Sequence, residues 1–139
     1  MDRRQLILGA AAAIPAARGQ SSGPIATAVI GTGNRGSHLL LGVLEQSGVK
    51  VAALCDIKPD RLDKAATAAA RDNPTTYSDW RRIIDRKDIQ AVFIATPPHL
   101  HAEMAAAALQ AGKHVYCEKP VGVTAAQVRA LLEAGRNSR

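Results

Sequence analysis

The chain has 139 residues and a net charge of +6 at pH 7, and its length is typical of a single domain. Hydrophobic residues make up 47% and charged residues 22%, which indicates an ordinary globular composition and excludes a disordered chain. There are 27 alanines and four aromatic residues, so the core must consist of Val, Ile, Leu and closely packed Ala. No apolar run reaches the roughly 20 residues that a membrane-spanning helix needs.

The positive charge does not indicate a nucleic-acid partner. The densest basic cluster lies at residues 79–88, where three aspartates are interleaved with Arg81, Arg82, Arg86 and Lys87. Such a self-neutralised cluster is typical of a solvated helix face. We therefore expect no nucleic-acid binding, which would require a basic surface of one sign.

Residues 1–19 have the three-part layout of a signal peptide. Arg3 and Arg4 precede an uncharged stretch over residues 5–17, and Ala17 and Gly19 suit a cleavage site before Gln20. Paired arginines followed by Gln-Leu-Ile resemble a twin-arginine signal, which exports folded proteins to the periplasm or another extracytoplasmic site. The alternative is an uncleaved amphipathic tail on a cytoplasmic protein. Residues 20–24 are predicted to be a linker.

Apolar periodicity predicts an alternation of strands and helices from residue 25 onward. Strands are expected at residues 25–30, 49–55, 75–77, 89–96 and 113–117. Helices are expected at residues 35–46, 59–71, 100–110 and 124–135, with a further helix carrying Trp80, Ile83 and Ile84. This alternation predicts an α/β fold, a doubly wound parallel sheet with strand order 3-2-1-4-5. Because the pattern ends after a helix, we expect residues 25–139 to be the front part of a longer protein.

The first motif that could carry chemistry is a GxGxxG sequence between the first strand and the first helix. Gly31 would permit the tight turn, Gly33 would let the backbone approach a pyrophosphate, and Gly36 would let the helix pack close to the sheet. Free N–H groups at the helix N-terminus would receive the phosphate oxygens, and Arg35 would add a cation beside them. The motif therefore predicts a dinucleotide site.

Asp56 ends the second strand, 20 residues after Gly36. A carboxylate at this position accepts hydrogen bonds from the adenosine ribose hydroxyls and repels a 2′-phosphate, which favours NAD over NADP. Lys58 nearby keeps NADP possible, and an Asx turn before Pro59 would explain Asp56 without any ligand.

Two further segments follow the fourth and fifth strands. Residues 96–103 contain His99 and His101, but this spacing does not share a helix face and no third ligand follows, so we expect no metal site. The alternatives to a metal site are loop shaping by the prolines and helix capping by His99 or His101. In the second segment, Glu118 and Lys119 would reach the ligand edge of the sheet, where a lysine can hold a substrate oxygen. A surface ion pair is the alternative.

Four segments together resemble the Gfo/Idh/MocA oxidoreductases, the relatives of glucose–fructose oxidoreductase and inositol dehydrogenase. They are IGTGNRG at 30–36, CD at 55–56, ATPPHLHAE at 95–103 and AGKHVYCEKP at 111–120. The resemblance implies an NAD(P)-binding Rossmann domain at residues 25–139. It also implies a C-terminal substrate domain, absent from this chain, through which the parent protein would form a homo-oligomer. The implied substrate is a sugar, an inositol or a related polyol.

The resemblance also implies roles for individual residues. The pyrophosphate would be lined by Gly31, Gly33, Asn34, Arg35 and Gly36, and Asp56 would hold the adenosine ribose. The nicotinamide half would be bordered by Thr96, Pro97 and His101. Glu118 would contact the cofactor and Lys119 would orient the substrate. The family's proton-transfer histidine lies in the C-terminal domain, so no histidine of this chain receives that role.

Three hypotheses follow for function. The parent protein would be an NAD(P)-dependent dehydrogenase, or this chain would be a cofactor-binding fragment without activity of its own. The third is an NAD-dependent glycosidase, since one branch of the family hydrolyses N-acetylgalactosaminides. That branch typically lacks the lysine of the Glu-Lys-Pro triplet, so Lys119 favours the dehydrogenase.

The two cysteines are expected to remain unpaired even in an oxidising compartment. Cys55 and Cys117 end the second and fifth strands, and the predicted strand order places two strands between them. At roughly 4.8 Å per strand their separation is about 14 Å. A disulfide needs Cα atoms within about 7 Å.

Overall fold

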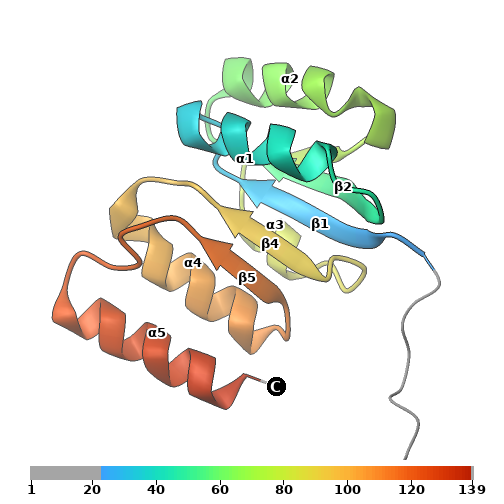
Figure 1. Ribbon diagram of the computed structural model, residues 1–139. Helices are drawn as coiled ribbons and strands as arrows, with labels where there is room; N and C mark the ends of the chain where they lie inside the picture. The colour runs from blue at the N-terminus through green and yellow to red at the C-terminus, as the bar shows by residue number, and fades with distance from the viewer. Residues whose placement is uncertain (1–22, 139) are drawn as a thin grey trace, which may run out of the picture.

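A computed structural model describes residues 23–138 (Figure 1). The strands are β1 (Ile25–Ile30), β2 (Val49–Cys55), β3 (Thr75–Tyr77), β4 (Ala91–Ile94) and β5 (His114–Cys117). All pair in parallel, in the order β3-β2-β1-β4-β5, which confirms the predicted topology. The carboxyl ends of the strands therefore share one edge of the sheet, where ligands bind in doubly wound folds.

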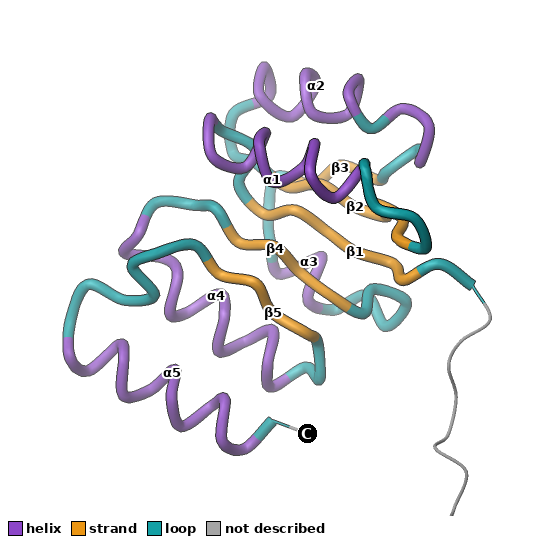
Figure 2. Tube along the Cα trace, viewed as in Figure 1, coloured by secondary structure: helices purple, strands orange, loops and turns teal. Residues whose placement is uncertain are grey.

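Helices cover both faces of the sheet (Figure 2). One face carries α1 (Asn34–Leu44) and α2 (Pro59–Ala68), followed by the short 3-10 turn η1 (Ala70–Asp72). The other carries α3 (Arg81–Ile84), α4 (Pro98–Gln110) and α5 (Ala125–Asn137). Two apolar clusters fill the layers, one around Val29, Leu40 and Leu54 and the other around Ile30, Ile94 and Met104. β1 contributes to both clusters, so it forms the centre of the core.

Several element boundaries differ from those predicted. β4 is shorter than residues 89–96 because Ile89, although 2% exposed, lies outside the strand. Its carbonyl oxygen instead accepts a hydrogen bond from the buried Lys113 ammonium at 3.0 Å. The predicted helix at 59–71 ends at Ala68, and its last residues form η1 before Asn73 adopts a left-handed φ of 50°. Apolar periodicity reports burial, and burial does not require strand or helix geometry.

The prolines of the β4–α4 loop begin a helix. Pro97 is the N-cap residue of α4 and Pro98 is its first residue, where a missing N–H costs nothing. No side chain caps this helix, so of the two alternatives helix capping by a histidine is wrong. The N-terminus of α5 is capped, since the Thr124 hydroxyl accepts a hydrogen bond from the Gln127 N–H at 3.2 Å.

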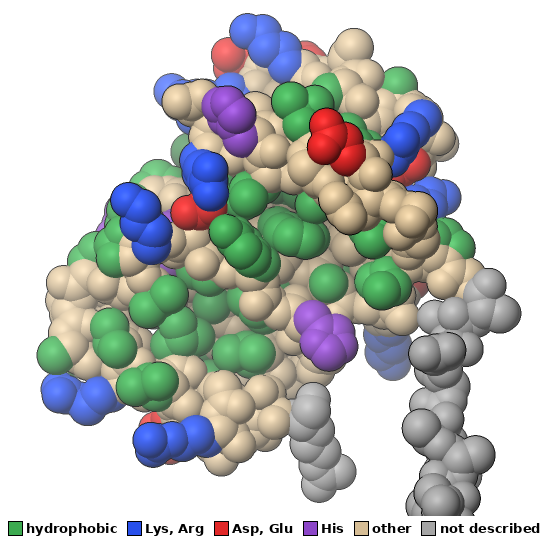
Figure 3. Space-filling model, in the orientation of Figure 1, with side chains coloured by type: hydrophobic (Ala, Val, Ile, Leu, Met, Phe, Trp, Pro, Cys, Tyr) green, Lys and Arg blue, Asp and Glu red, His purple; other side chains and the backbone are tan. Residues whose placement is uncertain are grey.

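The half of the sheet formed by β4 and β5 is less covered on the α1 side. Phe93 and Tyr116 lie on that face with ring centroids 5.7 Å apart, and Tyr116 is 46% exposed. Figure 3 shows hydrophobic side chains gathered between α1 and α5 in this view. Within residues 23–138, no helix is long and apolar enough to cross a membrane. The predicted signal peptide and most of the predicted linker lie outside the described residues.

Cys55 and Cys117 are both free, as predicted. They belong to one row of the sheet, in which Cys55 pairs with Ile30, Ile30 with Ile94, and Ile94 with Cys117. Burial is the main cause that raises the pKa of Cys55 to about 12 and that of Cys117 to about 11. Both thiols therefore remain protonated near neutral pH.

We expect both thiols to resist alkylation in the native protein. Compared with the ordinary thiol value of 9.0, the thiolate fraction near neutral pH falls roughly 100-fold at Cys117 and roughly 1,000-fold at Cys55. Mass spectrometry after brief iodoacetamide treatment should show no adduct, and treatment in urea should show two. Rapid labelling of the native chain, or a disulfide, would contradict this account.

Candidate functional site

The loop between β1 and α1 requires glycine at two positions. Gly31 has a φ of +86°, and a Cβ there would lie 2.8 Å from backbone atoms of Ala95 and Thr96. At Gly36, a Cβ would overlap the carbonyl oxygen of Gly31. Gly31 thus lets the β1–α1 and β4–α4 loops touch, and Gly36 lets α1 pack on the end of β1.

Gly33 differs from the other two glycines of the motif. Its φ of −66° suits any residue, and the nearest atom to a Cβ there is Nη1 of Arg61, the end of a flexible side chain, at 3.0 Å. The fold therefore does not require glycine at this position. Gly33 is the N-cap residue of α1, and no side chain caps this helix. The free N–H groups and positive end of α1 thus face an open backbone surface that an anion can approach.

Asp56 is held rigidly at the end of β2 and is 8% exposed. Its Oδ2 accepts hydrogen bonds from the Thr32 N–H at 2.7 Å and the Thr32 hydroxyl at 3.1 Å. Its Oδ1 accepts one from the Lys58 N–H at 2.9 Å. The Asx turn considered as an alternative is therefore present, and it fixes the same carboxylate beside the glycine loop.

Two cavities open at this edge of the sheet. The Asp56 cavity, of about 440 Å³, is lined among others by Gly31, Gly33, Asp56, Thr96 and Pro97. The Lys119 cavity, of about 620 Å³, is lined by Arg35, Ala95, Thr96, Pro98, His101, Tyr116, Glu118 and Lys119. Ala95 and Thr96 line both cavities, which are therefore neighbours across the point where β1 and β4 diverge.

Most of the predicted residues come together here, but not all in the same way. Gly36 is buried under the loop, so it serves packing, and Asn34 lines neither cavity. Pro97 lies in the Asp56 cavity, whereas its expected neighbour His101 lies in the Lys119 cavity. Several lining residues received no role from the sequence: Arg61, Ser78, Trp80 and Leu100 in the Asp56 cavity and Tyr116 in the Lys119 cavity.

Arg35 and Glu118 form an ion pair across the Lys119 cavity. Arg35 Nε lies 2.6 Å from Glu118 Oε1, and the side chains are 60% and 10% exposed. The hydrogen bond from Arg35 lowers the pKa of Glu118 below its ordinary value of 4.5. Arg35 is thus not an isolated cation beside the glycine loop, because it also positions the first residue of the Glu-Lys-Pro triplet.

This ion pair predicts a pH dependence of stability. Because the folded-state pKa of Glu118 lies below its unfolded value of 4.5, its contribution is complete above that pH and is lost as the pH falls through the folded-state pKa. In urea unfolding at a series of pH values, Glu118→Gln should differ from the parent by a constant amount near neutrality and by less below pH 4.5. Arg35→Met should behave alike. Parallel pH profiles for parent and variant would show that the pair contributes nothing.

His101 joins two loops of the site. It is 1% exposed, with Nδ1 2.8 Å from the Pro120 carbonyl oxygen and Nε2 2.7 Å from that of Thr96. Both ring nitrogens face backbone oxygens, so neither is available to a metal ion. Over residues 23–138, no group of three or more His, Cys, Asp or Glu side chains is placed to bind a metal. The histidine instead holds the Lys119 segment against the β4–α4 loop.

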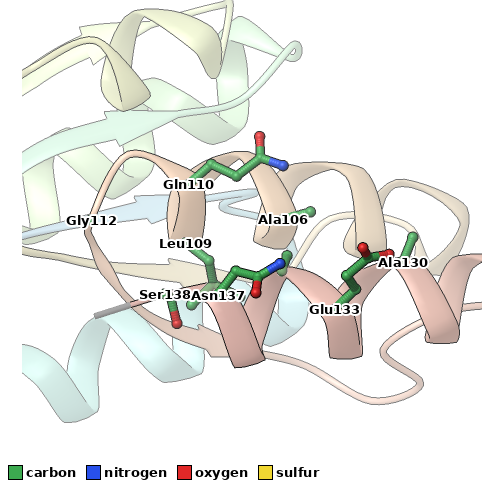
Figure 4. A pocket seen from close by; sticks show the side chains of 9 residues that line it. Ala106, Leu109, Gln110, Gly112, Ala130, Glu133, Asn137 and Ser138 are labelled. Carbon is green, nitrogen blue, oxygen red and sulfur yellow. The ribbon is translucent and has the colours of Figure 1, made fainter.

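A larger cavity, of about 770 Å³, lies elsewhere, between the C-terminal ends of α4 and α5 (Figure 4). Its lining includes Leu109, Gln110, Glu133 and Asn137, and Glu133 is its one charged side chain. Its lining contains neither a cation nor any residue for which the sequence predicts a role in a site. Size alone therefore does not make it the functional site.

The Asp56 and Lys119 cavities together suit a dinucleotide. The glycine loop leaves open the space that a Cβ at residue 33 would fill, a helix N-terminus faces it, and a fixed carboxylate stands beside it. The family model described as "Oxidoreductase family, NAD-binding Rossmann fold" matches residues 25–138. The chain belongs to the Gfo/Idh/MocA oxidoreductase family. Its Rossmann domain is of the NAD-binding type.

The Gfo/Idh/MocA relatives of this chain carry the names of different activities. A glycosyl hydrolase family 109 protein of Stenotrophomonas maltophilia is 40% identical over 89% of this chain and 31% of its own length. An inositol 2-dehydrogenase of Salmonella typhimurium is 41% identical over 76% of this chain and 32% of its own. The crystal structure of myo-inositol 2-dehydrogenase from Lactobacillus plantarum is 31% identical, with a TM-score of 0.77 over 83% of this chain and 34% of its own. The chain thus spans about a third of the relatives that it matches.

Proposed function

We propose that the protein is the cofactor-binding part of an NAD(P)-dependent oxidoreductase that acts on a sugar, an inositol or a related polyol. The observation that carries this proposal is the position of Lys119. Its side chain lines the same cavity as Arg35 and Thr96, directly beside the glycine loop and the Asp56 cavity. An ammonium group there is placed to donate a hydrogen bond to a substrate hydroxyl or carbonyl oxygen.

The Asp56 cavity and the Lys119 cavity have different roles in this proposal. The N–H groups at the start of α1 and the space over Gly33 would receive a pyrophosphate, and Asp56 would accept a hydrogen bond from a ribose hydroxyl. When bound, the nicotinamide accepts or donates a hydride. Lys119 orients the reacting carbon through its oxygen, while Glu118, fixed by Arg35, and His101 keep the Lys119 segment in place.

The test is reduction of NAD by the full-length protein, with its substrate domain, and with inositols and sugars as second substrates. Lys119→Met should lower kcat by about 100- to 1,000-fold, as loss of one preorganised donor does, and leave NADH affinity unchanged. Lys50→Met is the matched control, because this exposed lysine lies near the start of β2, at the opposite edge of the sheet. An unaltered kcat in Lys119→Met, or a full-length protein that binds NAD and does not reduce it with any polyol or sugar, would contradict the proposal.

An NAD-dependent glycosidase is the second candidate, and the similarity to the Stenotrophomonas glycosyl hydrolase family 109 protein supports it. The presence of Lys119 favours the dehydrogenase. Release of sugar from an N-acetylgalactosaminide without net NAD reduction would decide for the glycosidase.

We also propose that the protein is exported in the folded state. The proposal rests on the Arg3-Arg4 pair and the uncharged segment that follows it. Replacing both arginines by lysine should retain the protein in the cytoplasm, as cell fractionation would show. Unchanged fractionation of the double variant would reject twin-arginine export.

A further inference from the structure

Two positive charges converge on the backbone at Gly33. One is the partial charge at the N-terminus of α1, which faces this point because Gly33 is the N-cap residue and no side chain caps the helix. The other is the guanidinium of Arg61, a residue in the first turn of α2. Its Nη1 lies 3.0 Å, and its Cζ 3.6 Å, from the position of a Cβ on Gly33. Arg61 thus reaches from α2 to the glycine loop.

Arg61 brings its charge to this point without an anion to neutralise it. It is exposed, and the ion pairs among residues 23–138 involve other arginines, namely Arg35, Arg71, Arg81 and Arg86. A guanidinium beside a helix N-terminus places like charges together, which is unfavourable unless an anion lies between them. A phosphate bound over Gly33 would interact favourably with both.

The arginine inside the glycine motif is placed differently. Arg35 Nε lies 2.6 Å from Glu118 Oε1, so its charge is held at the Lys119 cavity. Arg61 instead lines the Asp56 cavity together with Gly31 and Gly33. Of the two arginines that line these cavities, Arg61 is therefore the one without an acidic partner within residues 23–138.

We infer that Arg61 supplies the mobile cation of the pyrophosphate site, binding phosphate oxygens from the α2 side while the N–H groups of α1 bind them from the other. This inference rests on the proposed function, because it concerns the same cofactor, and it adds a residue that the glycine motif does not contain. A guanidinium binds phosphate through two parallel N–H bonds. An exposed arginine side chain can also move aside as the ligand enters and then close on it. Arg61 therefore binds the part that NAD and NADP share.

The test compares adenosine, which carries no phosphate, with ADP, which carries a diphosphate. Titrations of the isotope-labelled full chain are followed by NMR, which detects weak as well as tight binding. Arg61→Gln should weaken ADP binding by about 10- to 100-fold, the value of a charge-assisted hydrogen bond, and adenosine binding by less than about 3-fold. NADH and NADPH should weaken by the same factor as ADP. Arg61→Lys keeps the charge without the paired N–H geometry, so it should recover part of the lost affinity.

The matched control is Lys64→Gln, which removes an exposed cation from α2 outside the cavity and should change none of these affinities. Unchanged ADP affinity in Arg61→Gln would overturn the inference and leave the proposed function standing. An equal loss of adenosine and ADP would place the guanidinium on the nucleoside, and a loss confined to NADPH would place it elsewhere on the ribose, so either would also overturn it. Failure of the parent to bind NADH or NADPH would instead reject the proposed function.

Discussion

Gly33→Val is expected to abolish NAD(H) binding while leaving the chain folded. The valine side chain would occupy the open surface at the N-terminus of α1, where a pyrophosphate must come within hydrogen-bond distance of the backbone. The fold should tolerate it, because the φ of −66° is ordinary and the one close neighbour is the flexible end of Arg61. We expect affinity for NADH to fall more than about 100-fold, or roughly 2.7 kcal/mol, in calorimetric titration.

Circular dichroism and urea unfolding of Gly33→Val should show a native chain whose stability lies within about 1 kcal/mol of the parent. Gly42→Ala is the control for NADH titration, since it adds a methyl group on the same helix where nothing lies within 4 Å. Unchanged NADH affinity in folded Gly33→Val would show that the glycine loop is not the pyrophosphate site.

Gly36→Ala is expected to prevent stable folding, even though it adds a single methyl group. A Cβ at this position would overlap the carbonyl oxygen of Gly31, a backbone atom held by the close contact of Gly31 with the β4–α4 loop. Relief requires α1 to move away from the sheet, which would separate Leu40 and Leu44 from their apolar cluster. The cost should exceed about 4 kcal/mol, the range associated with core disruption.

The measurement is urea unfolding followed by circular dichroism, with Gly42→Ala as the matched substitution on α1. Because residue 42 is helical and has open space, that variant should gain about 0.5–1 kcal/mol. A Gly36→Ala protein with parent-like stability would show that α1 does not pack as tightly on the β1–α1 turn as the structure has it.

The fold could be predicted from local patterns because each strand has its own signature. The bounds of β1 and β2 agree residue for residue, and the strand order follows from the alternation of strands and helices. The boundaries of β4 and α2 could not be predicted in this way. Ile89 is buried by contacts with distant residues although it lies outside β4, and Ala69 packs in the core beyond the end of α2. Apolar character determined where these residues lie but not their backbone geometry.

Some residues of the candidate site could likewise be predicted from the sequence, and others could not. Gly31, Gly33 and Asp56 could be identified because their spacing along the chain reflects the geometry of one βαβ unit. Arg61 could not be identified, because only the tertiary structure shows that its guanidinium lies beside Gly33. An exposed arginine on a helix has no signature of its own in the sequence. The partnership of Arg35 with Glu118 and the bonds from His101 to two loops likewise depend on tertiary contacts.

The ion pair between Arg35 and Glu118 joins residues 83 positions apart, and this separation has a consequence for the order of assembly. The lining of the Asp56 cavity ends at Met104, whereas the Lys119 cavity also needs β5 and the residues after it. Contacts that close long loops cost more chain entropy and form late in folding. During synthesis we therefore expect the Asp56 cavity to form first, and the Lys119 cavity to be completed only when β5 has joined the sheet.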